Sequence, residues 1–129
     1  YPCLDNKDVV KLYHGAKIVL NPHRRAPGAE SCNPRVYEVA ACRVFQISDY
    51  RAEIKELFGE SIPFYDPGVP WQLSTLIRYC LKDRDYRQRL AEMAFQRVQG
   101  QTFQARSKVI LETLEEFSKK RIKPQLAII

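Results

Sequence analysis

Hydrophobic positions along the chain fall into two patterns, short continuous runs and longer stretches with helical spacing. A continuous apolar run is typical of a strand buried on both faces, as in a parallel sheet. Such runs predict strands within residues 17–21, 44–47 and 62–65, and Pro63 restricts the last to an edge-like or early position. Helical spacing predicts helices over residues 5–14, 33–41 and 50–58. This alternation indicates an α/β fold, a parallel sheet with flanking helices.

Capping residues support these boundaries. Asn33 followed by Pro34 is a strong helix start, because Asn caps and Pro loses no hydrogen bond at the first helical position. Asp5 or Asn6 is expected to cap the first helix and Asp49 the third. Gly15 and Gly59 are expected to end these two helices.

Beyond residue 65 the pattern is helical only. The apolar positions of three helices are expected to share a face in each: Leu73, Leu76, Ile77 and Cys80; Leu90, Met93 and Ala94; and Phe103, Ile110, Leu114 and Phe117. Gly100 is expected to end the second of these helices, and Thr102 to cap the third. We assign residues 1–120 to one domain and 121–129 to a tail that either packs on a partner domain or frays.

Length and composition fit a soluble globular chain. The 129 residues are 45% hydrophobic and 28% charged, and no apolar run approaches the roughly 20 residues that span a bilayer. The N-terminus has neither a leader pattern nor a Met, so we expect a fragment of a longer protein.

Cysteine spacing and net charge narrow the function only slightly. Four scattered cysteines and two histidines give no metal-site spacing, so we expect free thiols, a reducing cytoplasmic location and no metal. The net charge of +6 suits an anionic partner, although a solvated basic face also explains most of it. Most aromatic residues occupy apolar helix or strand positions, which disfavours nucleic acid binding. A phosphate-sensing receiver-like domain is disfavoured because no paired acids end the first strand.

Candidate chemistry lies in the loop after the first strand, because ligands of open α/β sheets bind beyond the carboxyl ends of the strands. This loop carries His23, Arg24 and Arg25 and leads into the helix start at Asn33, where free backbone N–H groups attract phosphate. A solvated basic loop is the alternative interpretation.

Arg35 also favours an anionic ligand at this helix start. A cation in the first helical turn opposes the helix dipole, and a bound anion would offset that cost. The alternative is a surface ion pair with Glu38, three residues further on. The residues alone leave both interpretations open.

Two stretches resemble the glycosyl transferases group 1 family, in its spore-maturation-protein-like branch. They are Ala-Lys-Ile-Val-Leu-Asn-Pro-His-Arg at 16–24 and Asn-Pro-Arg-Val-Tyr-Glu-Val-Ala-Ala-Cys at 33–42. The similarity extends over about residues 5–117, and the Asn-x-Arg-x-Tyr-Glu helix is its most specific part.

The resemblance implies a GT-B fold, in which this chain forms part of the C-terminal, Rossmann-like, donor-binding lobe of a hexosyltransferase-type enzyme. A nucleotide-diphosphate sugar is the implied substrate, with no cofactor, and the N-terminal lobe of the same protein is the implied partner. Glu38 would accept hydrogen bonds from the ribose hydroxyls, because a carboxylate offers two acceptors to a vicinal diol. Glu30, separated from Glu38 by seven residues, would lie near the donor sugar. The loop basic residues and the Asn33 helix start would neutralise the diphosphate leaving group.

Arg43 departs from the family pattern, which has Gly at that position. Its side chain would either alter the turn into the second strand or point to solvent. We expect the fragment alone to be inactive. The alternative function is a catalytically inactive glycosyltransferase-like binding or structural module. Donor, acceptor and stereochemistry do not follow from the sequence.

Overall fold

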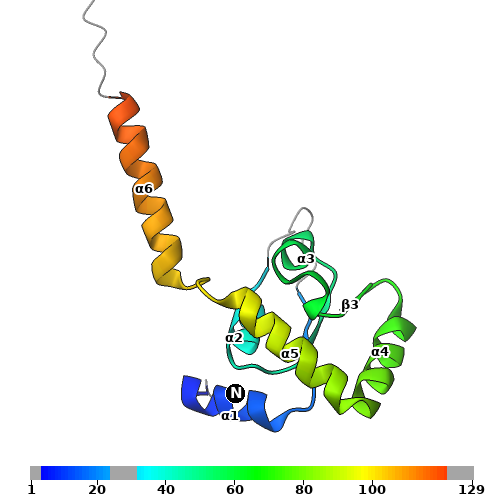
Figure 1. Ribbon diagram of the computed structural model, residues 1–129. Coiled ribbons are helices and arrows are strands. Elements are labelled where there is room, and N and C mark those ends of the chain that lie inside the picture. The colour runs from blue at the N-terminus through cyan, green and yellow to red at the C-terminus, as the bar shows by residue number, and fades with distance from the viewer. Residues whose placement is uncertain (1–3, 24–31, 122–129) are drawn as a thin grey trace, which may run out of the picture. The chain divides into compact units, whose positions relative to one another are not determined.

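The computed structural model describes residues 4–23 and 32–121 of the chain. It divides into two compact units, 1–99 and 100–129, each considered separately below. The first unit holds every strand found in the described residues (Figure 1). The second contains α6 (Phe103–Arg121), and the Thr102 hydroxyl accepts the Ala105 N–H at 3.1 Å, which confirms the predicted cap.

The first unit is built on a parallel sheet of order β1-β2-β3, and its strands are β1 (Val19–Asn21), β2 (Gln46–Asp49) and β3 (Phe64–Tyr65). The register pairs Leu20 with Ile47 and Asp49 with Tyr65. The α/β fold with a Rossmann-like parallel sheet is therefore confirmed.

Helices precede, connect and follow these strands. They are α1 (Asn6–Gly15), α2 (Pro34–Ala41), α3 (Ala52–Phe58), the 3-10 turn η1 (Gly59–Ser61), α4 (Pro70–Lys82) and α5 (Arg84–Val98). The Asn33 cap on α2 is confirmed, since its side chain accepts the Val36 N–H at 3.3 Å and Pro34 takes the first helical position. Gly59 ends α3 with φ 57° and ψ −126°, a conformation that favours glycine.

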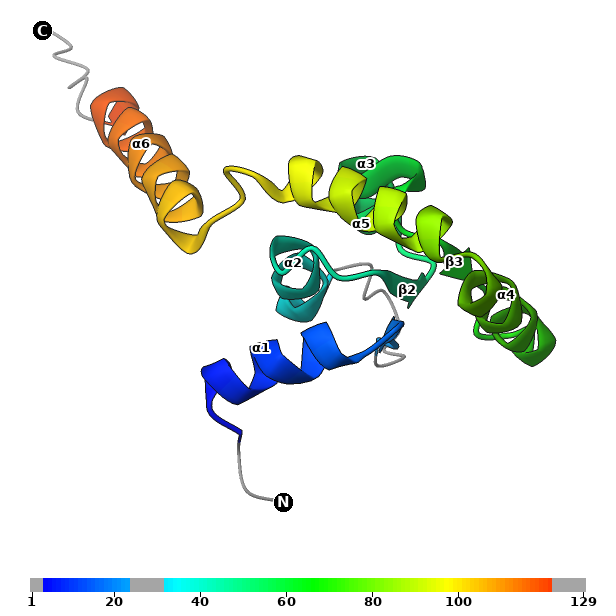
Figure 2. The ribbon, with the colours of Figure 1, turned by 60° about the horizontal axis from the view of Figure 1, so that its bottom comes forward.

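Two apolar clusters hold the unit together. One joins α2, α3 and α5 through Val36, Ile54, Phe58 and Val98. The other packs Phe45, Ile47 and Tyr65 of the sheet region against α4 and α5, with Cys80 fully buried. Residues of α5 belong to both clusters, so this helix joins them, and both ribbon views show it running between α2 and α4 (Figures 1 and 2).

Several sequence predictions were wrong in detail. Predicted strand 44–47 is displaced to 46–49, because ladder pairing begins at Gln46 and continues through polar Ser48 and Asp49. The first strand is not buried on both faces: Leu20 is 40% exposed, at the edge of the sheet within the described residues. Met93 is also exposed, at 41%, and Ala91 and Val98 fill the apolar face of α5 instead.

Two predicted caps were wrong as well. Asp5 occupies the cap position of α1 but makes no side-chain capping hydrogen bond. Asp49 does not cap α3, whose cap position is held by Arg51; the Asp49 carboxylate has other partners.

Candidate functional site

Polar side chains gather where β1 and β2 end, at the carboxyl edge of the sheet. We call His23, Asn33, Asp49 and Arg51 the carboxyl-end cluster. Asp49 is its centre: its side chain is 4% exposed and accepts the His23 backbone N–H at 3.2 Å. The other Asp49 oxygen accepts from Arg51 Nε and Nη2 at 3.3 and 3.2 Å. A buried carboxylate needs this compensation, because an unpaired charge there is costly.

The His23 ring joins three segments of the chain. Its Nδ1 lies 2.5 Å from Asp49 Oδ1, and its Nε2 accepts the Asn33 backbone N–H at 3.1 Å. A ring that accepts at Nε2 carries its proton on Nδ1, so Nδ1 donates to Asp49. The end of β1, the end of β2 and the start of α2 are thereby tied together, and both ring nitrogens have protein partners.

Below this cluster, buried amides connect the sheet to α2. The Asn21 amide donates to Gln46 Oε1 at 2.5 Å, and Gln46 in turn donates to the Val36 carbonyl at 2.9 Å. Ser48 Oγ donates to the Asn21 carbonyl at 3.2 Å. Asn21 Oδ1 is buried without a hydrogen-bond partner in the described part of the chain. Polar residues thus replace the apolar contacts expected on this side of a buried strand.

Glu53 of α3 hydrogen-bonds to α2 and to the residue that precedes its cap. Its carboxylate accepts the Cys32 backbone N–H at 2.8 Å and the Tyr37 hydroxyl at 3.3 Å. Burial, reinforced by the charges of Glu53 and Asp49, raises the pKa of the Cys32 thiol to about 12. Cys32 is therefore protonated at neutral pH and is not an activated nucleophile.

Arg35 and Glu38 lie on the exposed side of α2, next to α1. Burial and then the charge of Glu38 raise the pKa of Tyr13 in α1, while Arg35 lowers that pKa. The charges of Glu38 and Arg35 on α2 therefore both act on Tyr13 of α1, and the two helices are neighbours in both views (Figures 1 and 2). Among the described residues no ion pair joins Arg35 to Glu38, so the surface-pair interpretation of Arg35 is wrong.

A family model described as Glycosyl transferase-like matches residues 2–112. The chain belongs to this glycosyl transferase-like family. No curated protein and no solved structure matches it. Family membership supports a glycosyl-transfer module, and the carboxyl edge of the sheet is where an α/β fold of this kind binds its ligand.

The structure of this glycosyl transferase-like chain places the predicted site residues in two groups. His23 and Asn33 belong to the buried carboxyl-end cluster, whereas Arg35 and Glu38 face solvent. Arg24, Arg25 and Glu30 lie outside the described residues. At the α2 start Pro34 has no N–H and the Val36 N–H donates to the Asn33 side chain.

Sequence reasoning missed Tyr13, Asp49, Arg51 and Glu53. A signal for Asp49 existed, because a polar Ser-Asp pair ends an otherwise buried strand beside the candidate loop. Tyr13 carried no such signal, since its contact with Glu38 depends on how α1 packs beside α2.

The structure also bears on the cysteines, on membrane spans and on the aromatic residues. Cys32, Cys42 and Cys80 are free thiols, as expected. No helix in the described ranges is long and apolar enough to span a bilayer, and no His, Cys, Asp and Glu residues there group into a metal site. Several aromatic residues, Tyr50, Trp71 and Phe103 among them, are more than half exposed, so an apolar position in the pattern does not imply burial for these side chains.

Proposed function

We propose that this chain forms the donor-binding lobe of a hexosyltransferase that uses a nucleotide-diphosphate sugar. The observation that carries the proposal is the pair Arg35 and Glu38, exposed on the helix that follows the first strand and not neutralised by each other. In a glycosyl transferase-like chain, a cation and a carboxylate at this edge match the diphosphate and the sugar hydroxyls of such a donor.

Each residue has a proposed role. Glu38 accepts hydrogen bonds from the ribose hydroxyls, and Tyr13 of α1 lies within electrostatic reach of its carboxylate. Arg35, with Arg24 and Arg25, neutralises the diphosphate, so that leaving-group charge is stabilised without a metal. Glu30 lies near the donor sugar. His23 and Asn33 serve this site by fixing the loop and the α2 start, because the His23 ring is already bonded at both nitrogens.

A complete transferase of the proposed GT-B type needs a second, N-terminal lobe that carries the acceptor. We therefore propose that this chain works in the cytoplasm as one half of such an enzyme of the spore-maturation-like branch, does not bind nucleic acid and is inactive alone. A catalytically inactive binding module with the same lobe is the second candidate. It is supported by the Arg43 departure from the family pattern.

Nucleotide titration of the 129-residue chain tests donor binding. We expect UDP, GDP or dTDP to shift backbone amide resonances of residues 32–38, one of them more strongly than the others. Glu38→Gln should weaken that binding about tenfold, since each charge-assisted hydrogen bond lost is worth roughly this factor. Glu56→Gln, on the exposed side of α3, removes the same charge away from the site and should leave affinity unchanged.

Equal affinities in both variants, or no shifts at millimolar nucleotide, would contradict the donor site. Sugar transfer by the protein carrying both lobes separates the two candidates. Under the enzyme proposal Glu38→Gln abolishes most transfer, whereas an inactive module shows no transfer in either form.

A further inference from the structure

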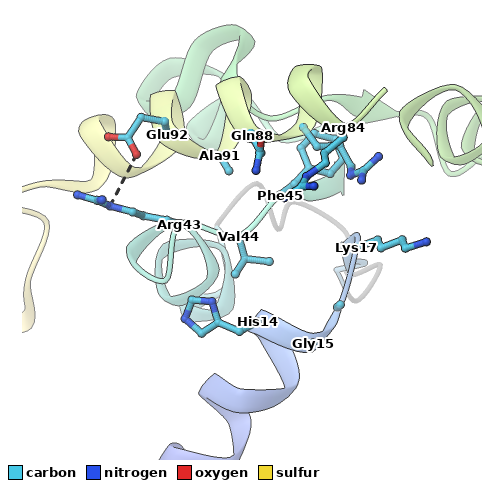
Figure 3. A pocket seen from close by; sticks show the side chains of 12 residues that line it. His14, Gly15, Lys17, Arg43, Val44, Phe45, Arg84, Gln88, Ala91 and Glu92 are labelled. Carbon is cyan, nitrogen blue, oxygen red and sulfur yellow. Dashed lines mark ion pairs between the residues drawn. The ribbon is translucent and has the colours of Figure 1, made fainter. Parts of the chain in front are cut away.

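We propose that a basic pocket at the opposite edge of the sheet binds a second, phosphate-rich anion of low molecular mass. The pocket has a volume of about 640 Å³ and is formed by the α1–β1 turn, the α2–β2 turn and the first half of α5. Figure 3 shows His14 of α1 and Gln88 of α5 on either side of Val44, with Glu92 directed toward Arg43. Arg84 lies further along α5, and the Lys17 side chain extends away from Val44. We call it the amino-end pocket, because its residues come directly before β1 and β2.

The amino-end pocket is separate from the donor site. Gly15, Ala16 and Lys17 precede β1, whereas His23 and Asn33 follow it. A three-residue strand spans about 10 Å, so the two sites lie at opposite ends of the same sheet. An anion in the pocket is thus a different function from donor binding.

Charge in the pocket is strongly unbalanced. Its lining contains the cations Lys17, Arg43, Arg84 and Arg87 and a single carboxylate, Glu92. That carboxylate lies 3.7 Å from Arg43 Nε (Figure 3). Lys17 and Arg84 have no carboxylate within ion-pair distance among the described residues. Cations that line one pocket disfavour one another, and an anion bound among them would relieve that repulsion.

The site is also partly preorganised. Arg87 Nη1 donates to the carbonyls of Cys80, Leu81 and Asp83 at 2.5–3.2 Å, which holds the guanidinium against the C-terminal end of α4. Arg43 is held over the Phe95 ring, 3.9 Å from its centroid. Guanidinium groups immobilised before binding lose little entropy when they bond to phosphate oxygens.

Apolar residues form the floor, which favours a compact ligand over a polymer. Val44, Phe45 and Ala91 are buried there, and water excluded by this surface strengthens charge interactions above it. The volume lies in the range of pockets that enclose small molecules, about 300–1,000 Å³. A phosphomonoester or diphosphate group, free or on a lipid headgroup, fits this combination of cations and size.

The test uses the 129-residue chain and inorganic tripolyphosphate, followed by amide shifts and calorimetry. We expect shifts at residues 15–17 and 43–45, and a loss of affinity of about tenfold or more in Lys17→Gln/Arg84→Gln. Lys7→Gln/Arg78→Gln removes the same two charges from exposed positions outside the pocket and should retain affinity within about twofold. Arg35→Gln, in the donor site, should leave the shifts at 15–17 intact.

Shifts confined to residues 32–38, or equal affinity losses in both double variants, would overturn the proposal. The source of the phosphate is decided by a further arm, co-sedimentation with vesicles containing phosphatidylinositol bisphosphate. Binding to these vesicles but not to neutral ones identifies a headgroup ligand. Tripolyphosphate binding without vesicle binding identifies a soluble ligand.

Discussion

Asp49 shows how a single carboxylate organises the candidate donor site. It bonds to the His23 ring and backbone on one side and to Arg51 on the other, while itself almost fully buried. Those contacts fix where the loop after β1 ends and where α2 begins. The geometry of the exposed pair Arg35 and Glu38 therefore depends on a residue that cannot itself reach solvent-side ligands.

We expect Asp49→Ala to lower the free energy of unfolding by about 3 kcal/mol, because removing one partner of a buried pair leaves the other uncompensated. Asp49→Asn keeps an acceptor for the His23 Nδ1–H and should cost less. Urea denaturation followed by circular dichroism gives both values. Asp85→Ala, at an exposed position of α5, is the control and should change stability by no more than about 0.5 kcal/mol. An Asp49→Ala loss as small as that of the control would show that the cluster is not a structural centre.

The sequence predicted a site in the loop after the first strand, and it misassigned Asp49 as a helix cap. Asp49 before a helical stretch satisfies the local rule for a cap, and the local rule was wrong because His23 and Arg51 compete for the carboxylate. His23 is 26 residues away, a separation over which neither periodicity nor cap statistics carries information. Asn33 was predicted correctly because its partner, Val36, lies within the same turn.

At the scale of elements, the turn between α2 and β2 carries the departure from the family pattern. Arg43 adopts φ 55°, the left-handed region that glycine occupies without strain. The backbone has thus kept the conformation of a glycine turn. The Arg43 side chain lies over Phe95 and near Glu92, and so connects this turn to α5.

Two substitutions at this turn separate backbone strain from side-chain contacts. Arg43→Ala and Arg43→Gly both lose the contacts with α5, but only Gly relieves the left-handed strain of about 1 kcal/mol. We expect the Gly variant to be more stable than the Ala variant by about that amount in urea denaturation. At Arg78, inside α4, the order should reverse, because Gly is about 1 kcal/mol worse than Ala in a helix interior. The same order at both positions would contradict a left-handed Arg43.

Predictions of helix faces and caps were correct where they depend on spacing within one helix. They failed where contacts with other elements determine which side chains are buried. The faces of α4 and the caps of α2 and α6 follow from spacing within one helix. Met93 fits the helical period of α5 yet is exposed, because α5 meets both apolar clusters through Leu90, Ala91, Ala94 and Val98 instead. Burial of a helix that crosses between two clusters depends on tertiary placement, which the period does not encode.

At the scale of the whole first unit, the sheet separates two charged edges. The carboxyl edge carries a compensated network and the exposed Arg35 and Glu38. The amino edge carries the pocket cations, of which Lys17 and Arg84 have no carboxylate partner among the described residues. The net charge of +6 is thus unevenly distributed: part of it gathers in one pocket, as well as lying on solvated helix faces. This clustering was not readable from the sequence, because Lys17, Arg43 and Arg84 come together only when three elements meet.

Alkaline pH should unfold this unit, because burial raises the pKa of several neutral thiols and phenols together. Burial is the largest cause of the raised pKa in five groups. They are the thiols of Cys32, Cys42 and Cys80, whose ordinary pKa is 9.0, and the phenols of Tyr13 and Tyr86, whose ordinary pKa is 10.0. A group with a raised folded-state pKa contributes stability that is complete below its unfolded pKa and is lost as pH rises through the folded value. The window therefore opens near pH 9 and, for Cys32, extends to about 12.

We expect the urea midpoint of unfolding to be constant between pH 7 and 8.5 and to fall progressively from pH 9 to 11 at fixed ionic strength. The Cys32→Ser variant keeps a donor for the Asn33 carbonyl but does not ionise in this range, so its midpoint should fall less steeply. Lysine deprotonation affects both proteins equally and cancels in the comparison. Parallel curves for the variant and the natural sequence would show that the Cys32 thiol is not held protonated by burial beside Glu53 and Asp49.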